Sequence, residues 1–271
     1  MKTLKLTITC LFVTLFTFAD VSITEKDALV AIYNSTQGSE WNNTWDLNTS
    51  IDTWHGVVVK DNKVVELNLQ FNNLQGKLPN SIGNLVHLKK MNLGFNKLQG
   101  NLPTSIGDLS KLSSLELFMN KFEGDIPNEI GNLYSLETLK LYSNAFTGEI
   151  PTSIGNLVGL RELELGSNFL TGKIPAQLQM LTQLETLSLI DNKLVGEIPS
   201  ELGQLALLEE LILSSNSLSG NIPEELYQLA NLNTLMLSDN ELNEEPVSII
   251  NSNPSNLQLQ LHGSSIIVTR N

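Results

Sequence analysis

The sequence predicts an α/β repeat fold: a right-handed solenoid with short parallel strands on its concave face and 3-10 or other short helices on its convex face. Three residue types recur at one constant step along most of the chain, the step that leads from Asn72 to Asn96. Three coincident series of this length cannot arise by chance, so the chain is predicted to be one unit repeated. The series are Asn72, Asn96, Asn120, Asn144, Asn168, Asn192, Asn216 and Asn240; Gly76, Gly100, Gly124, Gly148, Gly172, Gly196 and Gly220; and Pro79, Pro103, Pro127, Pro151, Pro175, Pro199 and Pro223.

Each recurring residue of the unit has a physical role. Leu67 and Leu69 alternate with a polar residue, as in a short strand whose leucines point inward. Asn72 follows at the turn, where its amide can bond backbone groups of neighbouring turns that would otherwise be buried and unpaired. Gly76 allows a close approach or a positive φ, and Pro79 suits the first turn of a short helix. One unit cannot bury its leucines, but stacked units bury a continuous core.

Residues 1–19 are predicted to be a secretory signal peptide. Two lysines precede an apolar run, residues 6–18, which has the length of a signal-peptide core, and Ala19 suits cleavage before Asp20. The run is too short for a membrane anchor and is interrupted by threonines. Cys10, the one cysteine, lies inside it, so the exported chain would have no disulfide bond. No second apolar run has the length of a membrane span.

Residues 20–65 lack the repeat and are predicted to form an N-terminal cap. A helix is expected over residues 24–33, with Ser22 or Thr24 as its N-cap and acidic residues in its first turn. A loop that contains two tryptophans and a W-H-G-V segment follow. Their apolar side chains would cover the open end of the solenoid.

Eight 24-residue repeats are predicted over residues 66–246, followed by a degenerate ninth repeat and C-terminal cap over residues 247–271. In this last turn Leu259 and Leu261 keep the step, but Ser264 replaces the asparagine. Terminal repeats are expected to be atypical because they close the core.

The repeats resemble those of plant-type leucine-rich repeat proteins, whose unit carries L-x-G-x-I-P followed by x-x-[IL]-G-x-L. The resemblance covers residues 24–265. The cap resembles the helix and W-x-G-V segment of plant receptor-like proteins, but Asp52 and Val59 stand where two plant cysteines form a disulfide bond. In this it is more similar to secreted bacterial members, especially those of marine Bacteroidetes. The resemblance implies a curved solenoid that binds proteins or glycans on its concave face, as polygalacturonase inhibitors and receptor ectodomains do.

Composition and charge argue against several functions. The 271 residues carry 16 Lys and Arg against 29 Asp and Glu, a formal charge of −13, whereas nucleic acids and anionic membranes attract clustered cations. His55, His87 and His262 lie in the cap, on the convex side and in the last turn, too far apart for a metal site. There is no cysteine nucleophile after the signal peptide and no phosphate-binding or dinucleotide-binding motif. The sequence therefore predicts a protein that is not an enzyme and needs no cofactor.

The solvent-facing positions of the concave strands point to a ligand-binding surface. Large apolar side chains gather on the first four turns, although aromatic residues make up only 6% of the chain. Exposed apolar patches often mark binding sites. The alternative is that these rings pack on neighbouring turns; it is favoured for Phe71 and Phe95, whereas docking is favoured for Phe118 and Tyr142. The predicted residues of this patch are Gln70, Phe71, Phe95, Phe118, Met119 and Tyr142.

Acidic residues follow further along the same face. Glu162 and Glu164 lie on one turn, with Asp191, Glu210 and Asp239 beyond them. Such a stretch could meet a cationic partner or a loosely held Ca²⁺, although a solvated acidic face is the simpler interpretation. Glu162 and Glu164 are predicted to form an electrostatic rim of the binding site.

The favoured hypothesis is an exported, non-catalytic binding module that recognises a protein or carbohydrate ligand through its concave face. An inhibitor of a secreted polysaccharide-degrading enzyme, which would use the same face, is the alternative. Ice or surface binding is a weaker one. Thr138, Thr186 and Thr234 share one strand column, but charged residues interrupt it. The sequence does not name the ligand.

Overall fold

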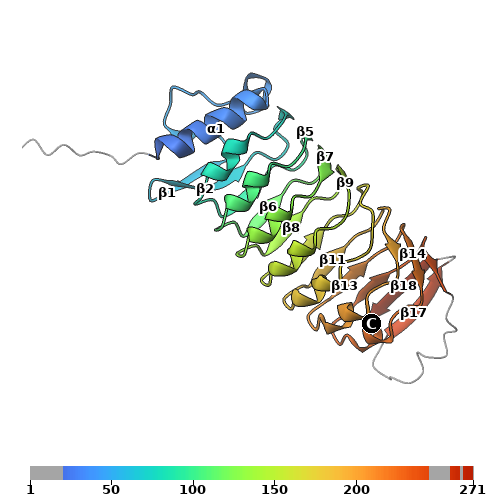
Figure 1. Ribbon diagram of the computed structural model, residues 1–271. Helices are drawn as coiled ribbons and strands as arrows, with labels where there is room; N and C mark the ends of the chain where they lie inside the picture. The colour runs from blue at the N-terminus through green and yellow to red at the C-terminus, as the bar shows by residue number, and fades with distance from the viewer. Residues whose placement is uncertain (1–20, 244–256, 263–264, 271) are drawn as a thin grey trace, which may run out of the picture.

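The computed structural model describes residues 21–243 and the backbone of residues 257–262 and 265–270. It is an elongated solenoid whose coils follow one another from the N-terminal cap to the C-terminal strands (Figure 1). A long sheet of short strands forms one side, and 3-10 helices form another. The predicted solenoid of parallel strands and short helices is confirmed. The predicted signal peptide lies outside the described residues.

Eight parallel strands, one for each predicted repeat, form the body of the main sheet in the described part of the chain. Each pairs with the next in a register of one repeat step, so that Leu67 pairs with Met91 and Leu163 with Leu187. Residues one step apart are therefore side-by-side neighbours along the whole sheet. The strands are β2 (Lys63–Asn68), β4 (Lys90–Asn92), β6 (Ser114–Glu116), β8 (Thr138–Lys140), β10 (Glu162–Glu164), β11 (Thr186–Ser188), β13 (Glu210–Ile212) and β15 (Thr234–Met236).

Coil 1 begins at residue 66 in β2, and each later coil begins one repeat step further on. A five-residue 3-10 helix on the far side of each of the first seven coils begins directly after a repeat proline. Proline presets the φ that a helix needs and lacks only an N–H that the first turn leaves unpaired in any case. The helices are η3 (Asn80–Asn84), η4 (Thr104–Asp108), η5 (Asn128–Asn132), η6 (Thr152–Asn156), η7 (Ala176–Met180), η8 (Ser200–Gln204) and η9 (Glu224–Gln228).

Two small lateral sheets, which the sequence analysis did not predict, lie between the strand turns and the helices. The repeat glycines fall in this layer with positive φ, 74° at Gly124 and 70° at Gly148. A Cβ atom at either position would meet the side chain of Asn101 or Asp125 in the preceding coil. Glycine is therefore required by both conformation and space. The lateral strands are β3 (Gln75–Gly76), β5 (Lys97–Gly100), β7 (Lys121–Asp125) and β9 (Ala145–Thr147) in one sheet, and β12 (Val195–Gly196), β14 (Ser217–Gly220) and β16 (Glu241–Leu242) in the other.

The core is a continuous column of aliphatic side chains. Leu67 and Leu69 of coil 1 are fully buried, and so are their counterparts in the next six coils. Phe122 and Phe146 take the place of leucine in two neighbouring coils, where their rings stack with centroids 6.0 Å apart. Each such side chain stabilises the fold by about 1.5–3 kcal/mol through removal from water.

The asparagine ladder holds the turns that leave the strands. The Asn144 amide Nδ2 donates to the carbonyls of Leu141 in its own coil and of Leu117 in the preceding coil, at 2.9 and 3.1 Å. Its Oδ1 accepts from the backbone N–H of Phe122, at 3.1 Å. The equivalent three contacts recur at every ladder position from Asn96 to Asn240. The hydrogen bonds expected of the ladder are present.

The N-terminal cap closes coil 1. Helix α1 (Ile23–Ser35) begins after Ser22, whose Oγ accepts from the N–H of Glu25, so Ser22 is the N-cap. The cap continues through η1 (Gly38–Glu40) and η2 (Ile51–Thr53) to β1 (Val57–Lys60), which pairs antiparallel with β2 and ends the sheet. The first ladder residue, Asn72, accepts from the N–H of Asn43, so the ladder ends on the cap.

Aromatic rings form the centre of this cap. Trp45 lies 4.9 Å from Trp41 and 4.8 Å from Trp54 between ring centroids, and all three rings are buried. Each indole N–H donates to a backbone carbonyl of the cap, which removes the cost of burying it. None of the helices in the described residues combines the length and apolar character of a membrane span.

The C-terminal strands differ from the predicted ninth turn. Strands β17 (Leu257–His262) and β18 (Ser265–Arg270) pair with each other antiparallel, and β18 lies antiparallel to β15. Leu259 and Leu261, which keep the repeat step in the sequence, lie in the outer strand, β17, and not in a further parallel strand of the series. A hairpin extends the sheet with a short connection, whereas a parallel strand requires a full crossover.

We expect Asn144→Ala to lower the free energy of unfolding by about 1–3 kcal/mol, because two carbonyls and one N–H of the turn lose their partner. Urea denaturation measures this change. Asn156→Ala is the matched control, since that side chain is exposed at the end of η6. Equal unfolding midpoints for the wild type and Asn144→Ala would contradict the role of the ladder.

Candidate functional site

Four aromatic rings form a continuous run across the first four coils of the concave face. Phe71 and Phe95 stack with ring centroids 4.0 Å apart, and Phe118 and Tyr142 stack at 4.8 Å. Phe95 and Phe118 meet edge to face at 5.3 Å. These four residues and Met119 are called the aromatic surface below. The predicted apolar patch is thus brought together, and Gln70 is half-buried beside it on coil 1.

The exposure of these side chains agrees only in part with the favoured interpretation: Phe71 and Phe95 pack on each other, as expected, and Tyr142 is half-buried, but Phe118 is buried. Phe71, Phe95 and Met119 are 58%, 37% and 42% exposed, whereas Phe118 is only 6% exposed. Gly94 explains the difference: a Cβ atom there would lie 2.7 Å from the tip of the Phe118 ring, which fills the space above the glycine. The choice of Phe118 as a docking residue is corrected, because its ring is a buried support for its neighbours.

The three exposed members of the aromatic surface share an unusual backbone conformation. Phe71, Phe95 and Met119 have φ of 56°, 52° and 51°. The left-handed region costs a residue with a side chain about 1–2 kcal/mol. The same turn position in later coils has the same left-handed φ with small polar residues, so the turn itself does not require a large apolar side chain. Those residues are Ser143, Ser167, Asp191, Ser215 and Asp239.

Lys140 lies at the end of the aromatic surface that is next to coil 5. Its Nζ lies 2.6 Å from Glu162 Oε2 and 2.9 Å from Glu164 Oε1. Glu164 is directly opposite Lys140 in the paired strands β8 and β10. The two glutamates predicted to form an electrostatic rim thus share a cation: Lys140 compensates part of their charge, and it is not among the site residues predicted from the sequence. Its position one repeat step before Glu164 is the signal that could have revealed the pair.

The two glutamates also shift the titration of their neighbours. Burial lowers the pKa of Lys140, but hydrogen bonds and charge attraction from Glu162 and Glu164 outweigh burial and raise it above its ordinary value. Burial is the main cause that raises the pKa of the Tyr142 hydroxyl, and the negative charge of Glu164 adds to it. Lys140 thus stays charged at neutral pH, and Tyr142 stays neutral.

A second polar group lies beside the aromatic surface on coils 2 and 3. The carboxylate of Glu116 accepts hydrogen bonds from the Asn92 amide at 3.0 Å and from the Ser114 hydroxyl at 2.9 Å. These contacts fix Glu116 in place within the sheet columns. These three residues lie outside the site predicted from the sequence.

Two family models of leucine-rich repeats match the chain: the Leucine-rich repeat region over residues 65–167, and the Leucine Rich Repeat over residues 159–181, 183–205 and 207–229. The chain is a leucine-rich repeat protein. No curated protein sequence matches it.

Solved structures of plant proteins have similar folds. The plant peptide hormone receptor RGFR1 in complex with RGF2 is 39% identical with a TM-score of 0.62, over 63% of this chain and 27% of the receptor chain. The ectodomain of the receptor kinase GASSHO1/SCHENGEN3 from Arabidopsis thaliana is 31% identical with a TM-score of 0.69, over 83% and 30%. A plant ice-binding protein is 25% identical with a TM-score of 0.54, over 83% and 88%. The leucine-rich repeat chain described here spans less than a third of either receptor chain.

Acidic side chains remain on the later coils of this leucine-rich repeat protein. Asp191, Glu210 and Asp239 are exposed and form no ion pair with another described residue. Within the described residues, no group of three or more His, Cys, Asp or Glu is placed to hold a metal ion. His87 lies 3.4 Å from the buried carboxylate of Glu25.

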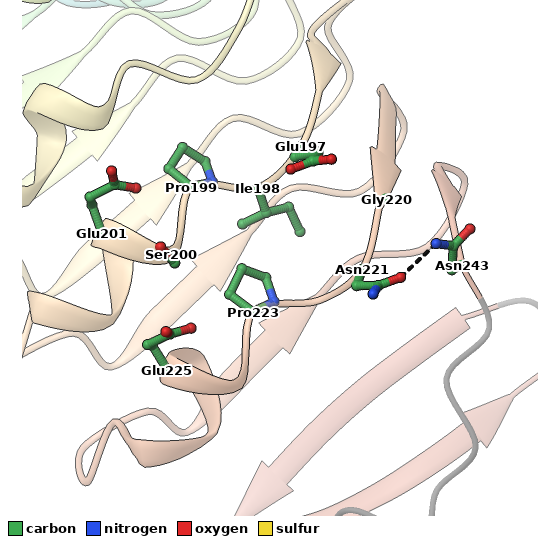
Figure 2. Close-up of a pocket in the computed structure, with 10 residues that line it drawn as sticks. All are labelled: Glu197, Ile198, Pro199, Ser200, Glu201, Gly220, Asn221, Pro223, Glu225 and Asn243. Carbon is green, nitrogen blue, oxygen red and sulfur yellow. Dashed lines mark hydrogen bonds between the residues drawn. The ribbon is translucent and has the colours of Figure 1, made fainter.

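An open depression of about 480 Å³ lies on another side, across coils 6 to 8 (Figure 2). Glu197, Glu201 and Glu225 line it from separate segments, and Figure 2 shows their carboxylates apart from one another. The Asn243 amide donates to Asn221 Oδ1 across its edge, at 2.5 Å. Nothing in its lining resembles the aromatic surface.

We expect Lys140→Met to lower the free energy of unfolding at pH 7 by about 1 kcal/mol, because Glu162 and Glu164 are left facing each other without a cation. The pKa of Lys140 is raised in the folded state, so its stabilisation is complete below the unfolded value of 10.5 and is lost only as pH rises through the folded value. The difference should therefore stay constant from neutral pH to about pH 10 and narrow above it.

Denaturant titration at several pH values measures this difference. Lys173→Met is the control, because Lys173 is exposed and has no ion pair among the described residues. Equal stability of Lys140→Met and the wild type at pH 7 would show that the pair contributes nothing.

Proposed function

We propose that the protein is an exported, non-catalytic binding module whose aromatic surface takes a protein or glycan ligand. The observation that carries this proposal is the choice of residue at one turn position. Coils 1 to 3 place Phe71, Phe95 and Met119 there in a left-handed conformation and leave them 37–58% exposed, whereas coils 4 to 8 have serine or aspartate.

Large apolar residues at this exposed turn position are unfavourable for the fold itself, so their presence indicates a function. An exposed phenylalanine or methionine gains little from the hydrophobic effect, and the left-handed φ adds a cost that small polar residues avoid or reduce. Stacking between Phe71 and Phe95 returns about 0.5–1.5 kcal/mol. Apolar side chains that the fold does not need, gathered on adjacent coils, are typical of binding surfaces.

The similar structures support a binding role. RGFR1 is a plant peptide hormone receptor in complex with RGF2, and the GASSHO1/SCHENGEN3 structure is a receptor-kinase ectodomain in complex with CASPARIAN STRIP INTEGRITY FACTOR 2. An exported protein that binds a ligand is in keeping with these similarities, and the chain corresponds to less than a third of either receptor. The resemblance of the cap to bacterial secreted members remains a prediction.

The similar ice-binding protein favours no ice-binding role here. Thr138, Thr186 and Thr234 share a strand column in every second coil, but Glu162 and Glu210 stand between them. Charged side chains interrupt the flat row of hydroxyl and methyl groups that such a surface would need.

We expect the double variant Phe71→Ala and Met119→Ala to keep the stability of the wild type within about 1 kcal/mol, because neither side chain belongs to the buried core. We expect it to weaken ligand binding at least about tenfold, as loss of central apolar contacts does. Ligands would first be selected on the wild-type protein from a random peptide display library and from a glycan array. Affinities for the selected ligands would then be compared between proteins.

Phe169→Ala is the matched control, since it removes a phenylalanine of similar exposure, 48%, from the lateral side. Ligands that bind the double variant as tightly as the wild type would place the site elsewhere.

A further inference from the structure

The aromatic rings of this surface cover one another, so that part of each ring is not open to a ligand. The two stacked pairs, Phe71 with Phe95 and Phe118 with Tyr142, each use one face of both rings. Phe95 and Phe118 meet edge to face, with an interplanar angle of 85°, so the edge of one ring covers a further face of the other. The rings thus follow one another along the solenoid, and most of their faces lie against a neighbouring ring.

This arrangement favours a peptide ligand over a glycan. A sugar ring binds an aromatic side chain by lying flat on its open face, and contacts between the rings already take up five of the eight faces here. Ring edges and the thioether of Met119, by contrast, offer apolar contacts to aliphatic or aromatic side chains of a peptide. Ring edges also carry the positive part of the aromatic quadrupole, which favours nearby negative charge.

Lysines lie around the same coils. Lys97 places its Nζ 2.8 Å from Asn73 Oδ1, two residues after the exposed Phe71. Lys121 is exposed two residues after Met119, and Lys90 is exposed at the start of β4; neither has an ion pair among the described residues. Residues 66–124 carry six basic and four acidic side chains in a chain whose net charge is −13. Glu116, an acid of these coils, is held by Asn92 and Ser114.

Beyond coil 4 the exposed charged side chains of the same face are mostly acidic. The ammonium of Lys140 is already held by Glu162 and Glu164 and is not available to an anionic ligand. Beyond it Asp191, Glu210 and Asp239 would repel negative charge. An anionic ligand is therefore restricted to coils 1 to 4.

We propose that the ligand of the aromatic surface is an acidic peptide segment, with large apolar side chains that pack on the ring edges and Met119 and with carboxylates near Lys90, Lys97 and Lys121. This inference rests on the proposed binding function and names its ligand class. A basic peptide and a glycan are the outcomes against which it is tested.

The test uses the purified protein against a random 12-residue peptide display library and a glycan array that includes neutral and uronic-acid chains. Enriched peptides would be synthesised, and their dissociation constants measured by fluorescence anisotropy at low and high salt. The variants are Lys97→Glu with Lys121→Glu, and Phe71→Ala with Met119→Ala. Lys111→Glu is the matched charge control, because this exposed lysine lies in the same half of the chain but in the segment between η4 and β6.

We expect the enriched peptides to contain more Asp and Glu than Lys and Arg, together with large apolar residues. Their affinity should fall on the order of tenfold in Lys97→Glu with Lys121→Glu, stay unchanged in Lys111→Glu, and fall as salt rises. Thermal unfolding of each variant checks that the fold is kept.

Three results would overturn the inference. Enrichment of basic peptides, or of glycans, that lose binding in Phe71→Ala with Met119→Ala would refute the ligand class and leave the proposed function intact. Acidic peptides whose affinity is the same for Lys97→Glu with Lys121→Glu as for the wild type would refute the role of the lysines. If no peptide or glycan depends on the aromatic surface, the proposed function fails together with the inference.

Discussion

The asparagine ladder is the constraint on which the rest of this structure depends. Each coil must turn sharply out of its strand while it is packed against coils on both sides, so backbone groups are buried at a place where no sheet can pair them. One amide per coil satisfies two carbonyls and one N–H, and it links each coil to the one before it. Because a single side chain makes all three contacts, the coils must follow at a constant step and in a constant register. The parallel strands, the glycines with positive φ and the helices after each proline all repeat within that step.

A constant register turns the exposed positions into columns in which neighbours along the solenoid are one repeat step apart in sequence. The fold asks little of these positions beyond a permitted conformation, and small polar residues meet that demand in coils 4 to 8. The large apolar side chains of Phe71, Phe95 and Met119 are therefore not explained by the fold, and we attribute them to ligand binding. Their buried support comes from a different column, where Gly94 leaves room for the ring of Phe118. Lys140 separates this apolar region from the acidic coils that follow.

Much of the candidate site could be predicted because the period alone shows which residues share a column. Gln70, Phe71, Phe95, Phe118, Met119 and Tyr142 do lie together, as their positions in the repeat required. Which of them reach solvent could not be predicted from the repeat pattern. The ring of Phe118 is buried because Gly94, one coil away, has no side chain and leaves space for it, while the next residue, Met119, turns outward with a left-handed φ. The pairing of Glu162 and Glu164 with Lys140 was not predicted for a related reason. Pairing with Lys140 acts across strands and is invisible in a count of charges along one coil.

The sequence by itself determined the solenoid, the step of its coils, the ladder and the columns of its concave face, because each follows from a local pattern repeated without change. Only the tertiary structure decided which rings stack, which of their faces stay open, which acids are neutralised and how the last strands pair. At the C-terminal end the pattern of Leu259 and Leu261 continued while the chain paired antiparallel, because strand direction depends on the connection between strands and not on the alternation of leucines. Local periodicity specifies the frame of this protein, and contacts between neighbouring coils specify its surface.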